Sequence, residues 1–159
     1  MNMNKIFISG LGVILILVLG YMVFQTRGGQ VVRESNGIIA TIYKSPTCGC
    51  CGVYTSYMKG EGYDVVSENV ADMSVIKKEL GVPYELESCH TMEVGGYVVE
   101  GHVPEEAVQK LLTERPDIKG IGMAGMPSGS PGMPGPKNEP FEIYEINHDG
   151  TVGEMFMTI

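Results

Sequence analysis

From residue 38 onward, the hydrophobic positions of the chain follow two alternating patterns. Short runs rich in β-branched residues are typical of buried strands, and apolar residues three or four positions apart are typical of amphipathic helices. Glycine and proline separate these stretches. In order, the pattern predicts a strand at 38–44, a helix through 53–58, a strand at 63–70, a helix at 73–80, two short strands within 90–103 and a helix beginning at 104–106.

Signals at the ends of these stretches support the same elements. Asp72 can cap the helix at 73–80, and Gly81 can end it. The apolar face of this helix would consist of Val75, Ile76 and Leu80. Gly95 and Gly96 predict a tight hairpin between the two short strands. The resulting order, β-α-β-α-β-β-α, is that of an α/β domain with the thioredoxin-like fold.

The C-terminal part continues with a loop and a second hairpin. Residues 122–136 consist mostly of glycine, proline, methionine and serine, a composition that excludes a helix or a central strand. Residues 141–157 then alternate like two strands that turn at 148–150. We therefore expect a C-terminal β-hairpin after a loop rich in methionine.

Residues 6–24 form one apolar segment without a charged side chain. As a helix, this segment would reach about 28 Å, close to the ~30 Å hydrocarbon core of a bilayer. A cleavable signal usually has a shorter apolar region, ~7–15 residues, and small residues at its end. This segment ends instead in the bulky residues 21–24. The sequence thus predicts one N-terminal transmembrane helix, with an anchor and tether at 1–29 and a single domain at 30–159.

Whether the first segment is an anchor or a cleavable signal, we expect the domain to be exported. We expect a membrane-anchored protein whose domain faces the periplasmic, extracytoplasmic side, or a secreted or periplasmic protein if the segment is cleaved. The orientation signal is weak, because Lys5 precedes the segment while Arg27 and Arg33 follow it.

The charge of the chain restricts its partners. The 159 residues carry 11 Lys and Arg against 19 Asp and Glu, a formal net charge of −8. Nucleic-acid binding requires clustered basic residues, so we predict no nucleic-acid partner. Eleven methionines and no tryptophan are the two unusual counts.

Three of the four cysteines lie within four positions, at 48, 50 and 51. They follow a predicted strand and precede a predicted helix, so Cys48 and Cys51 form a C-x-x-C pair at a helix N-terminus. The helix dipole stabilises thiolates there, which suits disulfide exchange and metal binding equally. In an exported domain, Cys48–Cys51 and Cys50–Cys89 could also be two structural disulfides.

The fourth cysteine, Cys89, precedes the third predicted strand and is followed by His90. Thioredoxin-like enzymes carry a cis-proline at this place, facing the C-x-x-C pair. Here Pro83 lies several residues upstream, so a thiol and an imidazole would face the cysteines instead. The alternative is that Cys89 is a small buried residue and His90 a hydrogen-bonded strand residue.

Four cysteine thiolates and one histidine imidazole would then lie close together, and such ligands suit Cu(I) or Zn(II). The methionines favour Cu(I), because thioethers bind Cu(I) better than Zn(II). Alternatively, these methionines cover an apolar patch of the domain. The predicted metal ligands are Cys48, Cys50, Cys51, Cys89 and His90, with Met123, Met126 and Met133 as an accessory capture loop.

The other two histidines are weaker candidates for metal ligands. His102 lies between the hairpin and the last helix, where it is either an auxiliary ligand or a capping and packing residue. His148, at the predicted C-terminal turn, is expected to be exposed to solvent.

The chain resembles the domain-of-unknown-function 411 family of small bacterial proteins that are described as metal-binding. The resemblance spans about residues 38–150 and rests on "YKSPTCGCC" (43–51), "GVPYELESCHT" (81–91), "GGYVVEGHVP" (95–104) and "RPDIKGIGMAGMPSGSPGM" (115–133). It implies a thioredoxin-like fold, an exported location and a link to copper or other heavy metals.

These observations lead to one prediction and two alternatives. We predict an exported protein that binds a soft metal, Cu(I) in first place, for sequestration or delivery to a metal-donor or metal-acceptor protein, without catalysis. The first alternative is a thiol–disulfide oxidoreductase, and the second is an interaction module held together by two disulfides.

Overall fold

The computed structural model describes residues 37–159. The predicted anchor at 6–24 and the predicted domain boundary after residue 29 lie outside these residues. Within the described part of the chain, no helix is both long and apolar enough to cross a membrane.

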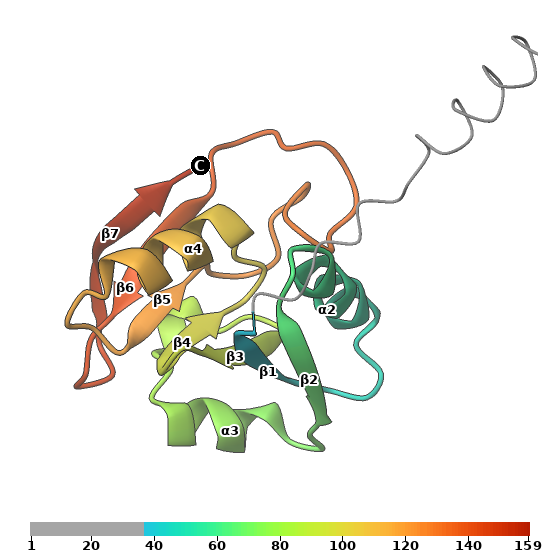
Figure 1. Ribbon diagram of the computed structural model, residues 1–159, viewed down its shortest axis with the longest axis horizontal. Helices are drawn as coiled ribbons and strands as arrows, with labels where there is room; N and C mark the ends of the chain where they lie inside the picture. The colour runs from blue at the N-terminus through green and yellow to red at the C-terminus, as the bar shows by residue number, and fades with distance from the viewer. Residues whose placement is uncertain (1–36) are drawn as a thin grey trace, which may run out of the picture. The chain divides into compact units, whose positions relative to one another are not determined.

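The described residues form a mixed α/β fold with three α-helices and one seven-stranded sheet (Figure 1). In chain order the elements are β1 (Ile39–Lys44), α2 (Gly49–Gly60), β2 (Asp64–Asn69), α3 (Met73–Leu80), the 3-10 turn η1 (Tyr84–Leu86), β3 (His90–Val94), β4 (Tyr97–Glu100), α4 (Glu105–Glu114), β5 (Gly120–Gly122), β6 (Glu142–Ile146) and β7 (Val152–Thr158). This order confirms the predicted β-α-β-α-β-β-α succession and the C-terminal hairpin.

The strands lie in the order β2-β1-β3-β4-β5-β6-β7. β1 runs parallel to β2 and antiparallel to β3, and β3 runs antiparallel to β4. Val94 pairs with Tyr97, so the two glycines between them form the tight turn that the sequence predicts. β4 and β5 are parallel, and α4 connects them in sequence.

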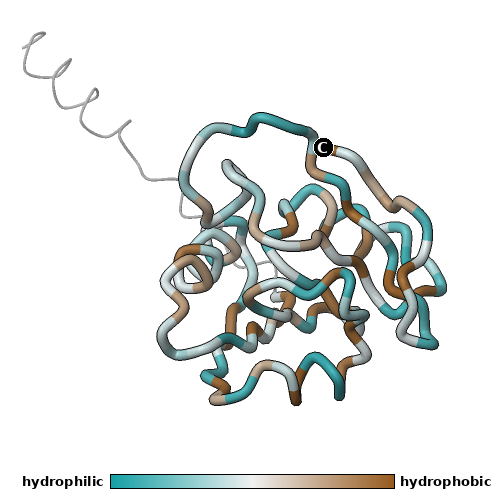
Figure 2. Tube along the Cα trace, turned by 180° about the vertical axis from the view of Figure 1, so that it is seen from behind, coloured by the Kyte–Doolittle hydropathy of each residue, from teal (hydrophilic) through white to brown (hydrophobic). Residues whose placement is uncertain are grey.

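The two faces of the sheet have different cores. Figure 1 shows α2 and α4 on one face and α3 on the other. The main core, between the sheet and α2 and α4, includes Ile42, Met92, Val99, Tyr54, Met58, Leu111 and Ile121. A smaller core of Val82, Leu86, Val98 and Ile146 fills the other face. Figure 2 shows hydrophobic and hydrophilic positions interspersed along the chain.

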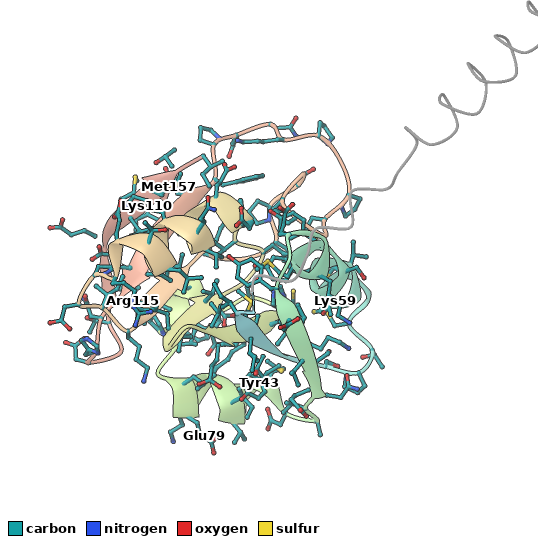
Figure 3. All side chains as sticks on the ribbon, in the orientation of Figure 1. Tyr43, Lys59, Glu79, Lys110, Arg115 and Met157 are labelled. Atoms are coloured by element: carbon teal, nitrogen blue, oxygen red, sulfur yellow. A yellow bond between two sulfur atoms is a disulfide. The ribbon has the colours of Figure 1, made fainter. Side chains whose placement is uncertain are left out.

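The C-terminal hairpin extends the sheet and packs against α4. The ammonium group of Lys110 on α4 lies 3.9 Å from the centre of the Phe156 ring on β7, and Figure 3 labels Lys110 beside Met157. At the turn, the backbone N–H of Asn147 donates to the carbonyl of Thr151 over 2.9 Å. The predicted hairpin is confirmed, and His148 in its turn is exposed.

Two sequence expectations differ from the structure. Asp72 caps α3 and Gly81 ends it as predicted, and Leu80 of the predicted apolar face packs against the smaller core. Val75 of that face is instead half exposed, and Lys77 is buried. Lys77 is buried because Glu100 and Thr91 accept its hydrogen bonds. The strand β5 was not expected, because its sequence, Gly-Ile-Gly, has a low strand propensity.

Candidate metal centre

The cysteine motif begins helix α2, as the sequence predicts. Cys48 is the N-cap residue, and Cys50 and Cys51 lie in the first turn. Cys48 and Cys51 form a disulfide with a Cα–Cα distance of 5.4 Å, whereas Cys50 and Cys89 are free thiols. Of the two disulfides that the sequence left open, the structure contains Cys48–Cys51 but not Cys50–Cys89.

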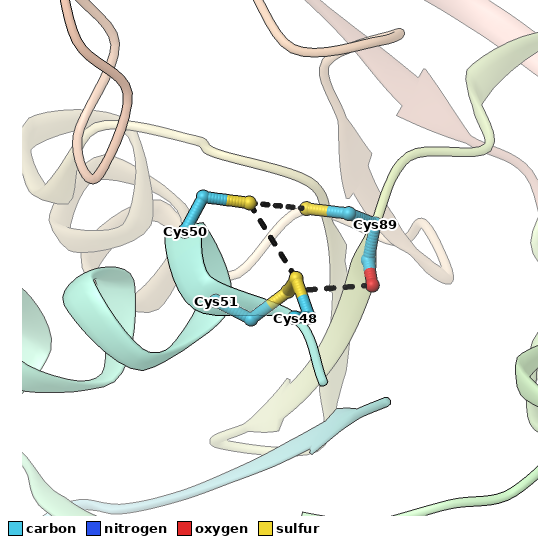
Figure 4. Close-up of side chains that lie close together, drawn as sticks. All are labelled: Cys48, Cys50, Cys51 and Cys89. Carbon is cyan, nitrogen blue, oxygen red and sulfur yellow. Dashed lines mark hydrogen bonds between the residues drawn. A yellow bond between two sulfur atoms is a disulfide. The ribbon is translucent and has the colours of Figure 1, made fainter. Parts of the chain in front are cut away.

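The four sulfur atoms lie together at the N-terminus of α2 (Figure 4). The Sγ atom of Cys50 lies 3.4 Å from that of Cys48 and 3.7 Å from that of Cys89. The Sγ atom of Cys51 lies 3.6 Å from the carbonyl oxygen of Cys89. The four sulfurs lie within 4.8 Å of one another, a spacing that allows them to share metal ions once the disulfide is reduced.

Cys89 also belongs to a second group, which contains His90 and His102. The Nε2 atom of His102 lies 2.9 Å from Cys89 Sγ, and its Nδ1 atom lies 2.6 Å from the carbonyl oxygen of Pro131. A carbonyl oxygen only accepts hydrogen bonds, so Nδ1 carries the proton and Nε2 directs its lone pair toward Cys89. A backbone carbonyl that fixes the tautomer in this way is typical of metal-binding histidines.

His90 has a nitrogen without a partner. Its side chain is fully buried, with Nδ1 3.4 Å from Cys89 Sγ and the ring centre 4.4 Å from that of Tyr54. The Nε2 atom of His90 is buried and has no hydrogen-bond partner. Leaving a buried polar atom unpaired costs roughly 1–3 kcal/mol. The nitrogen of His90 that faces Cys89 is Nδ1, so this atom would hold a metal ion bound between the two residues.

Burial also determines the protonation of these ligands. Burial, reinforced by the neighbouring His102 and Lys77, lowers the pKa of His90 well below its usual value. Burial and a hydrogen bond with Cys50 raise the pKa of Cys89 to about 12. Near neutral pH, His90 is thus a neutral imidazole, ready to bind a metal, while Cys89 keeps its proton until a metal ion displaces it.

The three methionines of the proposed capture loop lie in different environments. Met123 is buried in the main core with 2% of its surface exposed, which is the packing role that the sequence analysis left open. Met126 is 52% exposed and lines a pocket together with Cys89. Met133 is partly buried.

The loop itself lies against the cluster. A Cβ atom on Gly132 would come within 2.9 Å of the carbonyl oxygen of Cys50 and 3.3 Å of His102 Nδ1. With the hydrogen bond between Pro131 and His102, this contact fixes the loop beside the first turn of α2. The predicted loop at 122–136 contains no helix or strand from residue 123 onward, whereas Gly122 is the last residue of β5.

The sequence left the role of His102 open, although a signal for its position was present. The hairpin register pairs Val94 with Tyr97 and Thr91 with Glu100. Continued by two residues, the same register places His102 opposite Cys89. The cis-proline of thioredoxin-like enzymes has no counterpart before β3, because residues 37–159 contain no cis peptide bond.

The structure thus defines a mixed α/β protein whose cysteines and histidines form a cluster with the donor set of a soft-metal centre. Residues 86–133, which include Cys89, both clustered histidines and most of the loop, match the family described as "Protein of unknown function, DUF411". The chain belongs to this family.

Two solved structures of a protein named copper resistance protein CopG, form 2 and form 1, are similar to this chain. Each has a TM-score of 0.71 and 34% sequence identity over 78% of this chain. The matches cover 99% and 98% of those two chains. No curated protein matches the chain.

Proposed function

We propose that the protein binds copper as Cu(I) in the cluster at the start of α2 and sequesters it or delivers it to another protein. The observation that carries this proposal is the shared position of Cys89, which joins four sulfur atoms to two imidazoles within 4.8 Å in each group. Thiolates and imidazoles suit Cu(I), and Zn(II) is the second choice. Similarity to two structures of a copper resistance protein supports copper.

The proposed ligands are Cys48, Cys50, Cys51, Cys89 and His90, to which the structure adds His102 as a candidate. The two cysteines of the disulfide can bind metal only after reduction. An external dithiol would supply the two electrons and two protons that convert Cys48 and Cys51 to thiols, and would itself become a disulfide. Before reduction, Cys50, Cys89 and the two histidines remain as ligands.

The proposal extends to the fold and the location. A thioredoxin-like fold is supported by the strand order β2-β1-β3-β4, with β3 antiparallel to both neighbours and a C-x-x-C motif after β1. Membrane anchoring with the domain on the periplasmic side is supported by the apolar segment at 6–24, which has the length of a bilayer span. An exported copper-binding protein would meet its metal outside the cytoplasm.

A thiol–disulfide oxidoreductase is the second candidate function. The disulfide at the N-terminus of α2 favours it, because the same position lowers thiol pKa values in oxidoreductases. The cluster histidines favour metal binding instead, since disulfide exchange by a C-x-x-C pair needs neither imidazole.

Two measurements on the full chain, purified in detergent and fully reduced without oxygen, separate the candidates. Competition titrations with chelators of known affinity should show tighter binding of Cu(I) than of Zn(II). Retention of Zn(II) against equimolar Cu(I) would assign the site to zinc. Turnover in an insulin-reduction assay without metal binding would make the protein an oxidoreductase and overturn the metal-binding function.

A further inference from the structure

Cys89 is the cluster residue that lines a pocket open to solvent. The pocket has a volume of about 520 Å³ and lies between the segment that leads into β3 and the loop at Gly125 and Met126. Its lining also includes Glu85 and Glu87. This volume is within the usual range for small-ligand sites, roughly 300–1,000 Å³.

Three other residues of the cluster are buried, whereas Cys48 and Cys50 are partly exposed, as Cys89 is. Cys51, His90 and His102 have no exposed surface. Gly132 of the loop lies against the backbone of Cys50. A metal ion that reaches the buried imidazoles must therefore first meet a thiol nearer the surface. Cys89 is such a thiol, and its sulfur lies within hydrogen-bonding distance of both histidine side chains.

Hydrogen bonds hold the two walls of the pocket together. The hydroxyl of Ser88 donates to the carbonyl of Gly125, and the backbone N–H of Ser88 donates to Glu100 over 2.6 Å. Ser88 directly precedes Cys89, and Gly125 directly precedes Met126. The hydrogen bond between Ser88 and Gly125 therefore holds the two segments together. The thioether and the thiol thus flank one pocket whose shape is fixed before a metal arrives.

The chemistry of the pocket suits a soft cation. Met126 exposes 52% of its surface, so its thioether is available as a ligand and gains little from burial. Glu85 and Glu87 add negative charge, which attracts a cation over a longer range although carboxylates are poor ligands for Cu(I). The pocket thus offers long-range attraction, a weak soft ligand and a thiol.

We propose that this pocket is the port through which Cu(I) reaches and leaves the cluster, with Met126 as the transient first ligand and Cys89 as the first thiol to bind. The inference rests on the proposed Cu(I)-binding function and adds a route to it. At Cys89, the S–H bond breaks as the Cu–S bond forms, and the proton passes to solvent or to buffer. No change in the oxidation state of copper or sulfur is involved.

If Met126 binds Cu(I) only in transit, its substitution should change the rate of uptake. If Met126 were a ligand of the final site, its substitution would change the equilibrium affinity. Because Met126 binds the ion only in transit, Met126→Leu should slow Cu(I) uptake severalfold and leave the equilibrium affinity unchanged. Met155→Leu is the matched control, since Met155 is 50% exposed but lies on β7 and does not line the pocket. Leucine preserves volume and hydrophobicity at both positions.

The experiment follows Cu(I) transfer by stopped flow from a weak chromogenic Cu(I) chelator to the reduced full chain. The uptake rate should fall for Met126→Leu and match the parent for Met155→Leu. The double variant Glu85→Gln/Glu87→Gln should lower the rate by about tenfold at low salt, with the difference shrinking at high salt. Circular dichroism verifies that each variant folds.

Three results would overturn the port. Equal rates for Met126→Leu and the parent would show that copper takes another route, while Cu(I) binding itself would stand. A large loss of equilibrium affinity in Met126→Leu would make Met126 a ligand of the final site instead of a transit residue. A parent protein that binds no Cu(I) would end both the port and the proposed function.

Discussion

His90 and Thr91 are neighbours on β3, but their side chains enter two contrasting buried polar clusters on opposite faces of the sheet. Thr91 faces α3, where its hydroxyl donates to Glu100 over 2.6 Å and accepts from Lys77 over 3.2 Å. Lys77 also forms an ion pair with Glu100, and Glu100 accepts from the backbone of Ser88. Both carboxylate oxygens and the ammonium group have partners, so this network is closed.

The cluster on the α2 face is open by comparison. His90 Nε2 has no partner, and the free thiols of Cys50 and Cys89 have the sulfur of Cys48, each other and the imidazoles as hydrogen-bonding neighbours. Thiols are weak hydrogen-bonding groups, so these contacts do little to offset the burial of polar atoms. A closed network needs nothing further to be stable, whereas an open one is suited to an additional ligand. The contrast assigns a structural role to the α3 face and a metal-binding role to the α2 face.

The largest effect is expected from opening the closed network. Glu100→Leu would leave the Lys77 ammonium group buried without a counter-charge, and we expect the free energy of unfolding to fall by about 3–5 kcal/mol in urea denaturation. The double variant Lys77→Met/Glu100→Gln removes both charges, keeps an acceptor for Ser88 and should recover most of this loss. A loss under about 1 kcal/mol for Glu100→Leu would show that the ion pair is not a closed structural unit.

The next effect concerns the residue shared by both ligand groups of the open cluster. Cys89→Ser should weaken Cu(I) affinity by more than about 100-fold, beyond what loss of a supporting contact usually costs. Cys50→Ser is the matched variant, because Cys50 belongs only to the sulfur group. Competition titration should rank Cys89→Ser as the weaker binder, and equal losses would mean that the histidine group does not participate.

A third effect is the pH dependence of the reduced, metal-free protein. The pKa of His90 is well below its usual value in the folded protein, so below about pH 6.5 the unfolded chain binds a proton that the folded chain does not. The free energy of unfolding should therefore fall with decreasing pH, by up to about 1.4 kcal/mol per pH unit from this residue.

Denaturation at several pH values between about 7 and 5 measures this slope. His90→Leu should reduce the slope without abolishing it, because burial also lowers the pKa of His102, and His148→Asn, at the exposed hairpin turn, should keep it. A slope that His90→Leu does not change would mean that another group controls the acid sensitivity.

The smallest effect is expected from Met123. Its burial in the main core makes Met123→Leu a volume-conserving change that should cost less than about 1.5 kcal/mol. Cu(I) affinity and uptake rate should equal those of the parent. Weaker Cu(I) binding in a normally stable Met123→Leu variant would place Met123 among the copper ligands. Met123 would then no longer differ from Met126 in being a packing residue.

The sequence predicted those features that depend on local signals. Hydrophobic periodicity and caps such as Asp72 and Gly81 gave the element order through α4, and the C-x-x-C spacing placed the cysteines at a helix start. The proximity of Cys89 to these cysteines followed from the position of its segment before β3.

Other features depend on contacts between distant segments and were not predicted. A Cβ atom on Gly120 would lie 1.9 Å from the carbonyl oxygen of Val98, so β5 exists because glycine permits a close approach of two strands. Lys77 and Glu100 come from different elements, and neither has a local signal for burial. The burial of Met123 likewise depends on a core whose residues come from distant parts of the chain.

X-ray absorption spectroscopy of the reduced full chain loaded with Cu(I) tests the open cluster most directly. The account predicts copper bound mainly to sulfur, with the outer-shell scattering of at least one histidine imidazole. Loss of the imidazole contribution in a His90→Leu/His102→Leu variant would identify its source. A spectrum with sulfur but without imidazole would remove both histidines from the site, and one dominated by oxygen or nitrogen ligands would contradict the metal centre itself.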